Sequence, residues 1–275
     1  MDYTINVRGQ LLDLGKPVVM GILNVTPDSF YADSRTQTER EIAVRAHQIV
    51  EQGGAIIDVG ACSTRPQSTP VSADEELRRL RLALSVIKSE VPEALISIDT
   101  FRPEVARVAV EEYGADIIND VGAPASPPSS LSSHLSSAPE MFHMVSRLGV
   151  PYVLTSQQAT LPDMLITFAR DVQMLRDLGQ KDIILDPGFG FGKTLQQNYE
   201  VLSRMERILV MELPVLVGVS RKSMIYKSLG IQPETSLNGT TVLNTIALSK
   251  GASILRVHDV KEAVECCRLV EQLKG

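Results

Sequence analysis

The chain has 275 residues, of which 44% are hydrophobic and 22% are charged, with a formal net charge of -6 at pH 7. This length suits eight strand-helix units closed into one barrel, so we expect a single domain over residues 1–275. The acidic charge, without any Lys/Arg run, argues against a nucleic-acid partner, and the hydrophobic runs are too short to cross a membrane.

Short apolar segments with strand character alternate with segments of helical period along nearly the whole chain. Tyr3 to Leu12, with Gly9 at the turn, are predicted to form a hairpin that plugs the N-terminal mouth of a barrel. The expected strands are residues 18–23, 56–59, 95–98, 117–118, 152–154, 183–185, 215–217 and 254–257. The expected helices are residues 39–52, 73–90, 103–113, 140–148, 161–178, 197–209, 239–250 and 260–273. Apolar strands joined by crossover helices pair in parallel, which predicts an α/β fold, a TIM (β/α)8 barrel with an N-terminal β-hairpin.

Three connections are long for a barrel of this kind: residues 24–35, 61–69 and 123–138. We predict that the first two, NVTPDSFYADSR and ACSTRPQST, act as lids or binding loops, with plain surface loops as the alternative. The third, APASPPSSLSSHLSSA, is rich in Ser and Pro and lacks an apolar period. It is predicted to be a loop rather than a linker between two domains.

The three cysteines, Cys62, Cys266 and Cys267, show neither a CxxC motif nor a Cys/His ligand spacing. This pattern indicates reduced thiols rather than a disulfide framework or a zinc site. The N-terminus lacks the apolar stretch of a signal peptide. We therefore expect a cytoplasmic protein.

Polar side chains lie at or just after the C-terminal ends of the predicted strands. They are Asn24, Asp58, Asp99, Asn119, Asp186, Ser220, Lys222, Arg256 and His258. In a TIM barrel these ends converge on the mouth that carries the active site. The alternative for any single residue is that it terminates a strand or caps a helix.

Asp99 and Asp186 emerge directly from buried strands, so each carboxylate needs a partner. A flat ligand with amino and ring N–H donors would supply one. The alternatives are structural pairs with Arg102 or Lys193. For Asp58, the predicted role is capping of the loop that follows.

The segment DPGFGFGKT, residues 186–194, is one residue short of a nucleotide-binding phosphate loop. Its glycines are instead predicted to let the backbone approach a flat ligand, with Phe189 or Phe191 packing beside it; simple turns are the alternative. Arg221 and Lys222, and Arg256 to His258, follow the last two strands, where barrels of this kind usually bind anions. Together they predict a positive corner suited to a diphosphate, although each could instead be a surface or capping residue.

Seven motifs in this order resemble the dihydropteroate synthase family over nearly the whole chain. They are GILNVTPDSF, DVGACSTRP, SIDTF, IIND, ILDPGFGFGKT, GVSRKS and RVHDV. The resemblance implies a transferase of folate biosynthesis that condenses a (7,8-dihydropterin-6-yl)methyl diphosphate with 4-aminobenzoate, giving 7,8-dihydropteroate and diphosphate. It also implies inhibition by sulfonamides and a homodimer.

The resemblance further assigns roles to residues. Asn24 would hold the diphosphate and a Mg²⁺ ion, and Arg256 and His258 would bind the diphosphate, so these three and Lys222 are the expected catalytic residues. The pterin would contact Asp99, Asn119, Asp186 and Lys222, and Phe191 of the glycine-rich turn is a further expected substrate-binding residue. The 4-aminobenzoate pocket would be completed by Asp28, Phe30, Asp33, Thr64, Arg65 and Pro66, with Ser220 beside it.

Two segments depart from the family pattern. A His-containing MHMxG-like stretch is replaced by Thr155 to Ala159, and a Ser-Gly-Gly type turn after IIND is replaced by Val121 to Pro124. They leave a non-catalytic pterin-binding paralogue as an alternative. A third possibility, which shares the fold and the pterin carboxylates, is a pterin-dependent methyltransferase barrel working with a cobalamin partner. Such a methyltransferase would not need the residues 220–222 cluster or the Thr64-Arg65 loop.

Overall fold

The computed structural model describes residues 3–25, 35–62, 71–122 and 138–273. Eight parallel strands form a nearly closed barrel in the order β8-β7-β6-β5-β4-β3-β10-β9. They are β3 (Val18–Asn24), β4 (Ile56–Gly60), β5 (Leu95–Asp99), β6 (Ile117–Asp120), β7 (Tyr152–Thr155), β8 (Ile183–Asp186), β9 (Leu216–Val217) and β10 (Ile254–Val257). The ring closes between β8 and β9, where Leu185 bridges Val215 and its N–H donates to the Pro214 carbonyl at 2.9 Å. The predicted TIM barrel is confirmed.

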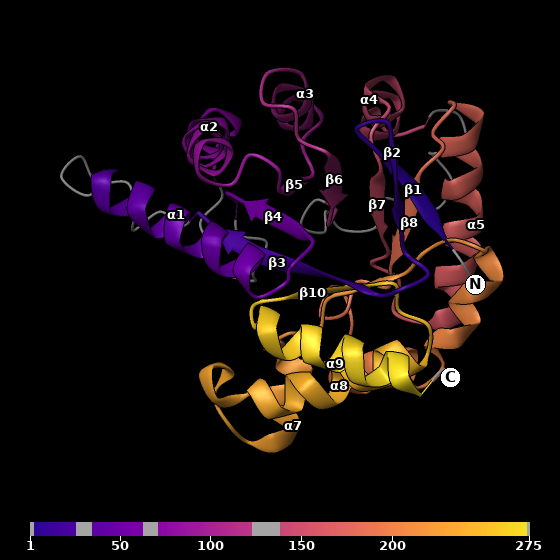
Figure 1. Ribbon diagram of the computed structural model, residues 1–275. Helices are drawn as coiled ribbons and strands as arrows, with labels where there is room; N and C mark the ends of the chain where they lie inside the picture. The colour runs from indigo at the N-terminus through magenta and orange to yellow at the C-terminus, as the bar shows by residue number, and fades with distance from the viewer. Residues whose placement is uncertain (1–2, 26–34, 63–70, 123–137, 274–275) are drawn as a thin grey trace.

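Helices surround the strands (Figure 1). They are α1 (Arg35–Glu51), α2 (Ala73–Glu90), α3 (Pro103–Glu111), α4 (Glu140–Leu148), α5 (Leu161–Asp177), α6 (Leu195–Ser203), α7 (Ser223–Leu229), α8 (Leu237–Ser249) and α9 (Val260–Gln272). Their ends follow local chemistry: Ser72 and Thr194 accept hydrogen bonds from the first turns of α2 and α6, and Gly149 ends α4 at φ 67°. These caps match the sequence signals that delimit the helices.

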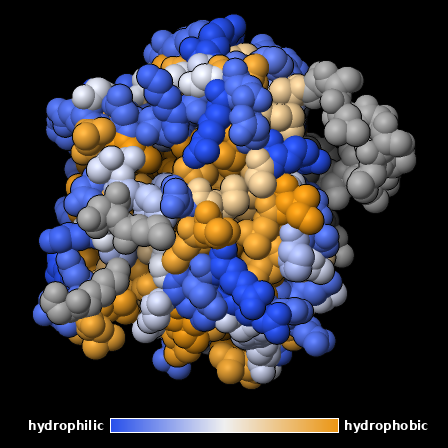
Figure 2. Space-filling view, turned by 90° about the vertical axis from the view of Figure 1, so that its right-hand side faces the viewer, coloured by the Kyte–Doolittle hydropathy of each residue, from blue (hydrophilic) through white to orange (hydrophobic). Residues whose placement is uncertain are grey.

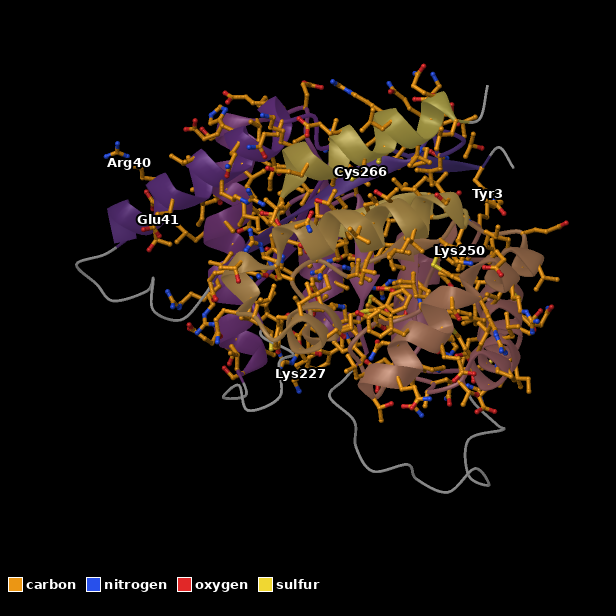
Figure 3. All side chains as sticks on the ribbon, turned by 90° about the horizontal axis from the view of Figure 1, so that it is seen from below. Tyr3, Arg40, Glu41, Lys227, Lys250 and Cys266 are labelled. Carbon is orange, nitrogen blue, oxygen red and sulfur yellow. The ribbon has the colours of Figure 1, made fainter. Side chains whose placement is uncertain are left out.

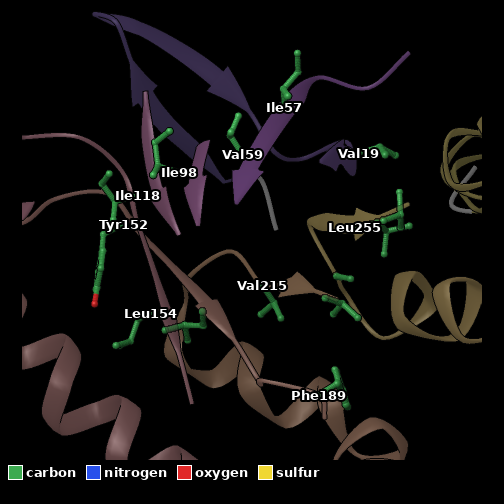
Figure 4. Packing of buried hydrophobic residues seen from close by; sticks show 14 of the residues in the cluster. Val19, Ile57, Val59, Ile98, Ile118, Tyr152, Leu154, Phe189, Val215 and Leu255 are labelled. Carbon is green, nitrogen blue, oxygen red and sulfur yellow. The ribbon is translucent and has the colours of Figure 1, made fainter. Parts of the chain in front are cut away.

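The core has two layers. Outward-facing strand residues pack against the helices, and Figure 4 shows members of this layer such as Val59, Ile118 and Leu255. Inside the barrel, a smaller cluster fills the end where the strands begin, and it includes Met20 and Val153. This packing leaves polar side chains to line the opposite end.

The N-terminal hairpin, β1 (Thr4–Val7) and β2 (Gln10–Asp13), covers the lower mouth. Ile5, Val7 and Leu14 belong to the interior cluster of the barrel. Arg8 clamps the hairpin to the base, because its Nε and Nη2 bond the two oxygens of Asp116 at 2.5 and 2.8 Å. The predicted hairpin and its plugging role are confirmed.

We expect Arg8→Ala to lower the free energy of unfolding by about 1–3 kcal/mol, because it removes the cation from the buried Asp116 carboxylate. Urea denaturation measures this change. Lys16→Ala is the matched control, since the Lys16–Glu271 pair is exposed and its loss should cost at most about 0.5 kcal/mol. Equal destabilisation by both variants would show that the Arg8 clamp does not hold the plug.

The predicted helix over residues 197–209 is wrong in its extent. Helix α6 ends at Ser203, and a 3-10 helix, η3 (Met205–Met211), follows. The Lys250 ammonium donates to the Ser203 carbonyl at 2.8 Å and so completes the helix end from another element. Helix α7 and the short η4 (Pro233–Thr235) were not expected from the helical period.

The surface that faces right in Figure 1 is a mosaic in which hydrophilic side chains separate patches of hydrophobic ones (Figure 2). Within the described ranges, no helix combines the length and the apolar character that a membrane span requires.

Candidate active site

The polar ends of the strands meet at one mouth of the barrel, as the sequence predicts. Hydrogen bonds or close approaches link eight of the expected residues there: Asn24, Asp99, Asn119, Asp186, Ser220, Lys222, Arg256 and His258. Six others, Asp28, Phe30, Asp33, Thr64, Arg65 and Pro66, lie outside the described residues.

The Arg256 guanidinium is the centre of this mouth. Its Nε donates to Asp58 Oδ2 at 2.6 Å, and its Nη2 donates to Asp99 Oδ2 at 2.5 Å. Asp58 is fully buried and also accepts from Ser97 Oγ at 2.6 Å and from Asn119 Nδ2 at 3.1 Å. Of the five N–H donors of Arg256, the described residues use two, so three remain to bind an anion.

Burial and neighbouring charge set the ionisation of this group. Burial raises the pKa of Asp99 to about 7, the attraction of Arg256 opposes that rise, and the Asp58 carboxylate adds to it. The two carboxylates also raise the pKa of Arg256, against the cost of its burial, so this side chain stays charged. The mouth therefore holds a permanent cation between two acids.

Asp186 and Lys222 form the second charged part of the mouth. Burial raises the pKa of Asp186, and Lys222 opposes the rise. Burial likewise lowers the pKa of Lys222 to about 8, which Asp186 opposes. Lys222 Nζ donates to the Phe189 carbonyl at 2.5 Å and lies 4.7 Å from the centre of the Phe191 ring.

The glycine-rich turn after β8 packs against the loop after β7. A Cβ at Gly188, whose φ is 65°, would lie 2.1 Å from the Ser156 carbonyl oxygen, and one at Gly192 would lie 2.8 Å from that of Gln157. Lys193 Nζ joins the two loops by donating to the carbonyls of Ser156, Gly188 and Phe191. Only glycine permits this close approach of the two loops. The turn therefore fixes the position of Phe191, and its Phe189 carbonyl accepts a hydrogen bond from Lys222.

His258 is held on three sides. Its backbone N–H donates to Ser220 Oγ at 3.2 Å, and its Nδ1 lies 3.0 Å from the same oxygen. Its carbonyl accepts from Arg45 Nη2 at 2.6 Å. Burial, then the charge of Arg256, lowers the pKa of His258 to about 4, so the ring is neutral at neutral pH.

These contacts predict one tautomer for His258. Ser220 Oγ accepts one hydrogen bond from the backbone, and we expect its own hydrogen to donate to Nδ1, which would leave the ring proton on Nε2. Nitrogen-15 spectra of the imidazole at neutral pH should show the Nε2–H form alone, and Ser220→Ala should give a mixture. The exposed His143 provides an internal reference that should not change. An Nδ1–H signal for His258 in the wild type would contradict this assignment.

Comparison with known proteins finds relatives over nearly the whole chain. The profile of the pterin-binding enzyme family, described as "Pterin binding enzyme", matches residues 20–258. The dihydropteroate synthase of Escherichia coli K12 is 40% identical over 96% of this chain and 94% of its own length. This chain belongs to the dihydropteroate synthase family.

Solved structures of the family share the fold. The Xanthomonas albilineans dihydropteroate synthase with 4-aminobenzoic acid is 31% identical and superposes with a TM-score of 0.87, covering 100% of this chain and 99% of that one. The Yersinia pestis dihydropteroate synthase with a sulfonamide drug is 32% identical, with a TM-score of 0.83, covering 99% of both chains. The barrel of this chain is therefore the fold of the solved dihydropteroate synthases.

One expectation needs correction in this member of the dihydropteroate synthase family, and two structural alternatives are not found. Asp58 does not cap the loop after β4; its side chain points into the barrel and holds Arg256, Asn119 and Ser97, because it occupies an inward position within the strand. Arg102 pairs with Glu76 rather than with Asp99. Lys193 bonds backbone carbonyls rather than Asp186.

Fewer residues supply positive charge to the mouth than the sequence predicts. Arg221 forms a bidentate pair with Asp259, at 2.9 and 2.8 Å, so its charge is compensated. The His258 ring, whose pKa is lowered to about 4, adds no charge at neutral pH. Among the described residues, the cations that line the mouth are Lys222 and Arg256, of which Arg256 is paired with Asp58 and Asp99 but keeps unused N–H groups.

Two residues that position the site were missed in the sequence. Arg45 lies on α1 and gave no signal, since an Arg on an amphipathic helix is usually a surface residue. Lys193 follows the glycine-rich turn and was considered only as a partner for Asp186. Of the pair Phe189 and Phe191, Phe189 is fully buried in the outer core, which leaves Phe191 to face Lys222.

Proposed function

We infer that this chain works as a dihydropteroate synthase, joining a (7,8-dihydropterin-6-yl)methyl diphosphate to 4-aminobenzoate. The observation that carries this function is the arrangement of the mouth. Buried acceptors for N–H donors, on Asp186 and Asn119, lie beside two cations, Arg256 and Lys222. A flat, N–H-rich ring with an attached diphosphate matches both features at once.

The pterin end of the substrate would bind above the β6 and β8 ends. Asp186 receives one hydrogen bond, from Gly188 N at 2.7 Å to Oδ1, and within the described residues its other oxygen has none. Asn119 Oδ1 is buried and has no partner in the described part of the chain. The amino and ring N–H groups of a pterin would satisfy these acceptors, and Phe191 and Lys222 would border the ring.

The diphosphate end would bind the remaining N–H groups of Arg256 and the Nε2–H of His258. We propose that Mg²⁺ also binds here through Asn24. The Asn24 Oδ1 and Asp99 Oδ2 atoms lie on either side of Gly60, at 3.1 and 3.6 Å from the position that a Cβ would occupy there. Oxygen donors suit Mg²⁺, which usually takes few protein ligands and completes its shell with phosphate oxygens and water. When bound, the ion would neutralise charge on the diphosphate.

The reaction then requires positioning and charge stabilisation rather than a protein nucleophile. The bond from the pterin methylene carbon to the diphosphate oxygen breaks, and its electron pair leaves on the diphosphate. Arg256 and His258 stabilise that charge through hydrogen bonds. The lone pair of the arylamine forms the new C–N bond, and the nitrogen then loses one proton.

The 4-aminobenzoate would enter beside Ser220, with Thr64, Arg65, Pro66, Asp28, Phe30 and Asp33 completing its pocket. The Xanthomonas albilineans relative binds 4-aminobenzoic acid and the Yersinia pestis relative binds a sulfonamide drug. We therefore propose that sulfonamides compete with 4-aminobenzoate in this chain.

The direct test is formation of 7,8-dihydropteroate from both substrates, with and without Mg²⁺. We expect turnover with Mg²⁺ that a sulfonamide inhibits competitively against 4-aminobenzoate. Tight pterin binding without turnover would instead indicate a non-catalytic pterin-binding protein.

We further propose that the chain forms a homodimer through α8 and α9, which run side by side on the outside of the barrel, at the bottom of Figure 1 and towards the viewer in Figure 3. Large hydrophobic side chains are exposed there, at Val242 and Ile246 on α8 and at Leu269 on α9. A second copy would cover them. Analytical ultracentrifugation should find a dimer, and Ile246→Glu should shift it to the monomer.

A further inference from the structure

The mouth contains a further buried polar atom that has no hydrogen-bond partner within the described residues. Among the described residues, the Thr155 hydroxyl oxygen is buried and makes no hydrogen bond, like Asn119 Oδ1. Buried polar groups are almost always bonded, so an unbonded one at a substrate site indicates a group that the ligand satisfies.

The topology places Thr155 inside the barrel. Side chains alternate along a strand: Tyr152 and Leu154 of β7 belong to the outer core, whereas Val153 belongs to the interior cluster. Thr155 therefore faces inward, one layer above Val153 and towards the mouth. It is paired in register with Asp186 on β8.

The neighbours of Thr155 are the proposed pterin residues. On one side, β8 carries Asp186; on the other, β6 carries Asn119, whose register partner is Val153. The Thr155 Cγ2 methyl lies 3.1 Å from the position that a Cβ would take at Gly188, so the methyl group faces the glycine-rich turn. Three polar side chains on adjacent strands thus border one space.

We propose that Thr155 is a further pterin-recognition residue, whose hydroxyl hydrogen-bonds the polar edge of the bound ring between Asn119 and Asp186. This inference rests on the proposed function, because it needs the pterin to occupy that space. A hydroxyl both donates and accepts, so it complements an edge on which donors and acceptors alternate. Thr155 also begins the Thr155 to Ala159 segment, so recognition in this chain uses a polar group at a position where the family pattern differs.

The test is Thr155→Val, which removes the hydroxyl and keeps the shape. Calorimetry should show a pterin lacking the diphosphate binding about tenfold more weakly, with the KM for 4-aminobenzoate unchanged. Thr155→Ser keeps the hydroxyl and should bind like the wild type. The melting temperature of ligand-free Thr155→Val should be equal to or above that of the wild type, because a buried unbonded hydroxyl is lost.

Ser146→Ala is the matched control. The Ser146 hydroxyl on α4 is also buried and unbonded within the described residues, but it lies on a helix outside the barrel. Its removal should not change pterin affinity. Unchanged pterin affinity in Thr155→Val, or equal weakening in Thr155→Ser, would overturn the inference about Thr155. Failure of the wild type to bind pterin would instead overturn the proposed function.

Discussion

Arg256→Lys should lower kcat/KM for the pterin diphosphate by about 100-fold or more, comparable with the loss of a transition-state hydrogen-bond donor. The guanidinium bonds Asp58 and Asp99 at once and keeps further N–H groups for an anion. An ammonium keeps the charge but is a point donor that cannot reproduce the planar fork. Steady-state kinetics with varied pterin diphosphate measures the effect.

Binding measurements separate catalysis from folding for Arg256. The affinity for a pterin without diphosphate should change little in Arg256→Lys, because the lost interactions are to the leaving group. Arg256→Met should also lower the melting temperature, because it leaves two buried carboxylates without a cation. The free energy of unfolding should fall by about 3–5 kcal/mol. Wild-type kcat/KM in Arg256→Lys would show that Arg256 only balances the charge of the acids.

The barrel was predictable because its signals are local and repeated. Each predicted strand lies within one to two residues of the observed one, and the Ala73–Glu90 and Glu140–Leu148 helices match at both ends. The differences are systematic: several strands continue into Asn24, Asp99 or Asp186, because the backbone ladder does not depend on side-chain polarity. The extent of α6 was mispredicted because its end is completed by Lys250 from α8's C-terminus, far along the chain.

The mouth was predictable as a set of residues, but the pairing within it was not. Strand ends converge in any barrel, so Asp99, Asn119 and Arg256 were expected to meet. Which acid bonds which base depends on register and on layer height inside the barrel. Asp58 shows this: a carboxylate in the middle of an apolar strand must find a buried partner, and only the closed ring reveals Arg256, from the other end of the sequence, as that partner.

Asp186→Asn should lower the affinity for the pterin by about 100-fold. The variant loses a charge-assisted pair of hydrogen bonds, and the NH2 group of Asn faces an N–H donor of the pterin. Gly188 N–H donates to Oδ1 of Asp186, so the amide oxygen of Asn would keep that bond. Its NH2 group would then take the place of the oxygen that receives the pterin N–H. Titration calorimetry with a pterin lacking the diphosphate measures this change.

The control for Asp186 lies at the other end of β8, one residue before the strand begins. Asp182 precedes β8 at the opposite mouth, where it accepts from Asn6 N at 3.2 Å, and Asp182→Asn should leave pterin affinity unchanged. Folding should survive in Asp186→Asn at neutral pH. Burial raises the pKa of Asp186. The folded wild type therefore loses stability as the pH rises from the pKa of this carboxyl group in the unfolded chain to its higher pKa in the folded protein, and an amide has no such loss. If a folded Asp186→Asn variant binds pterin as tightly as the wild type, Asp186 does not recognise the pterin, and the proposed pterin site is wrong at its central residue.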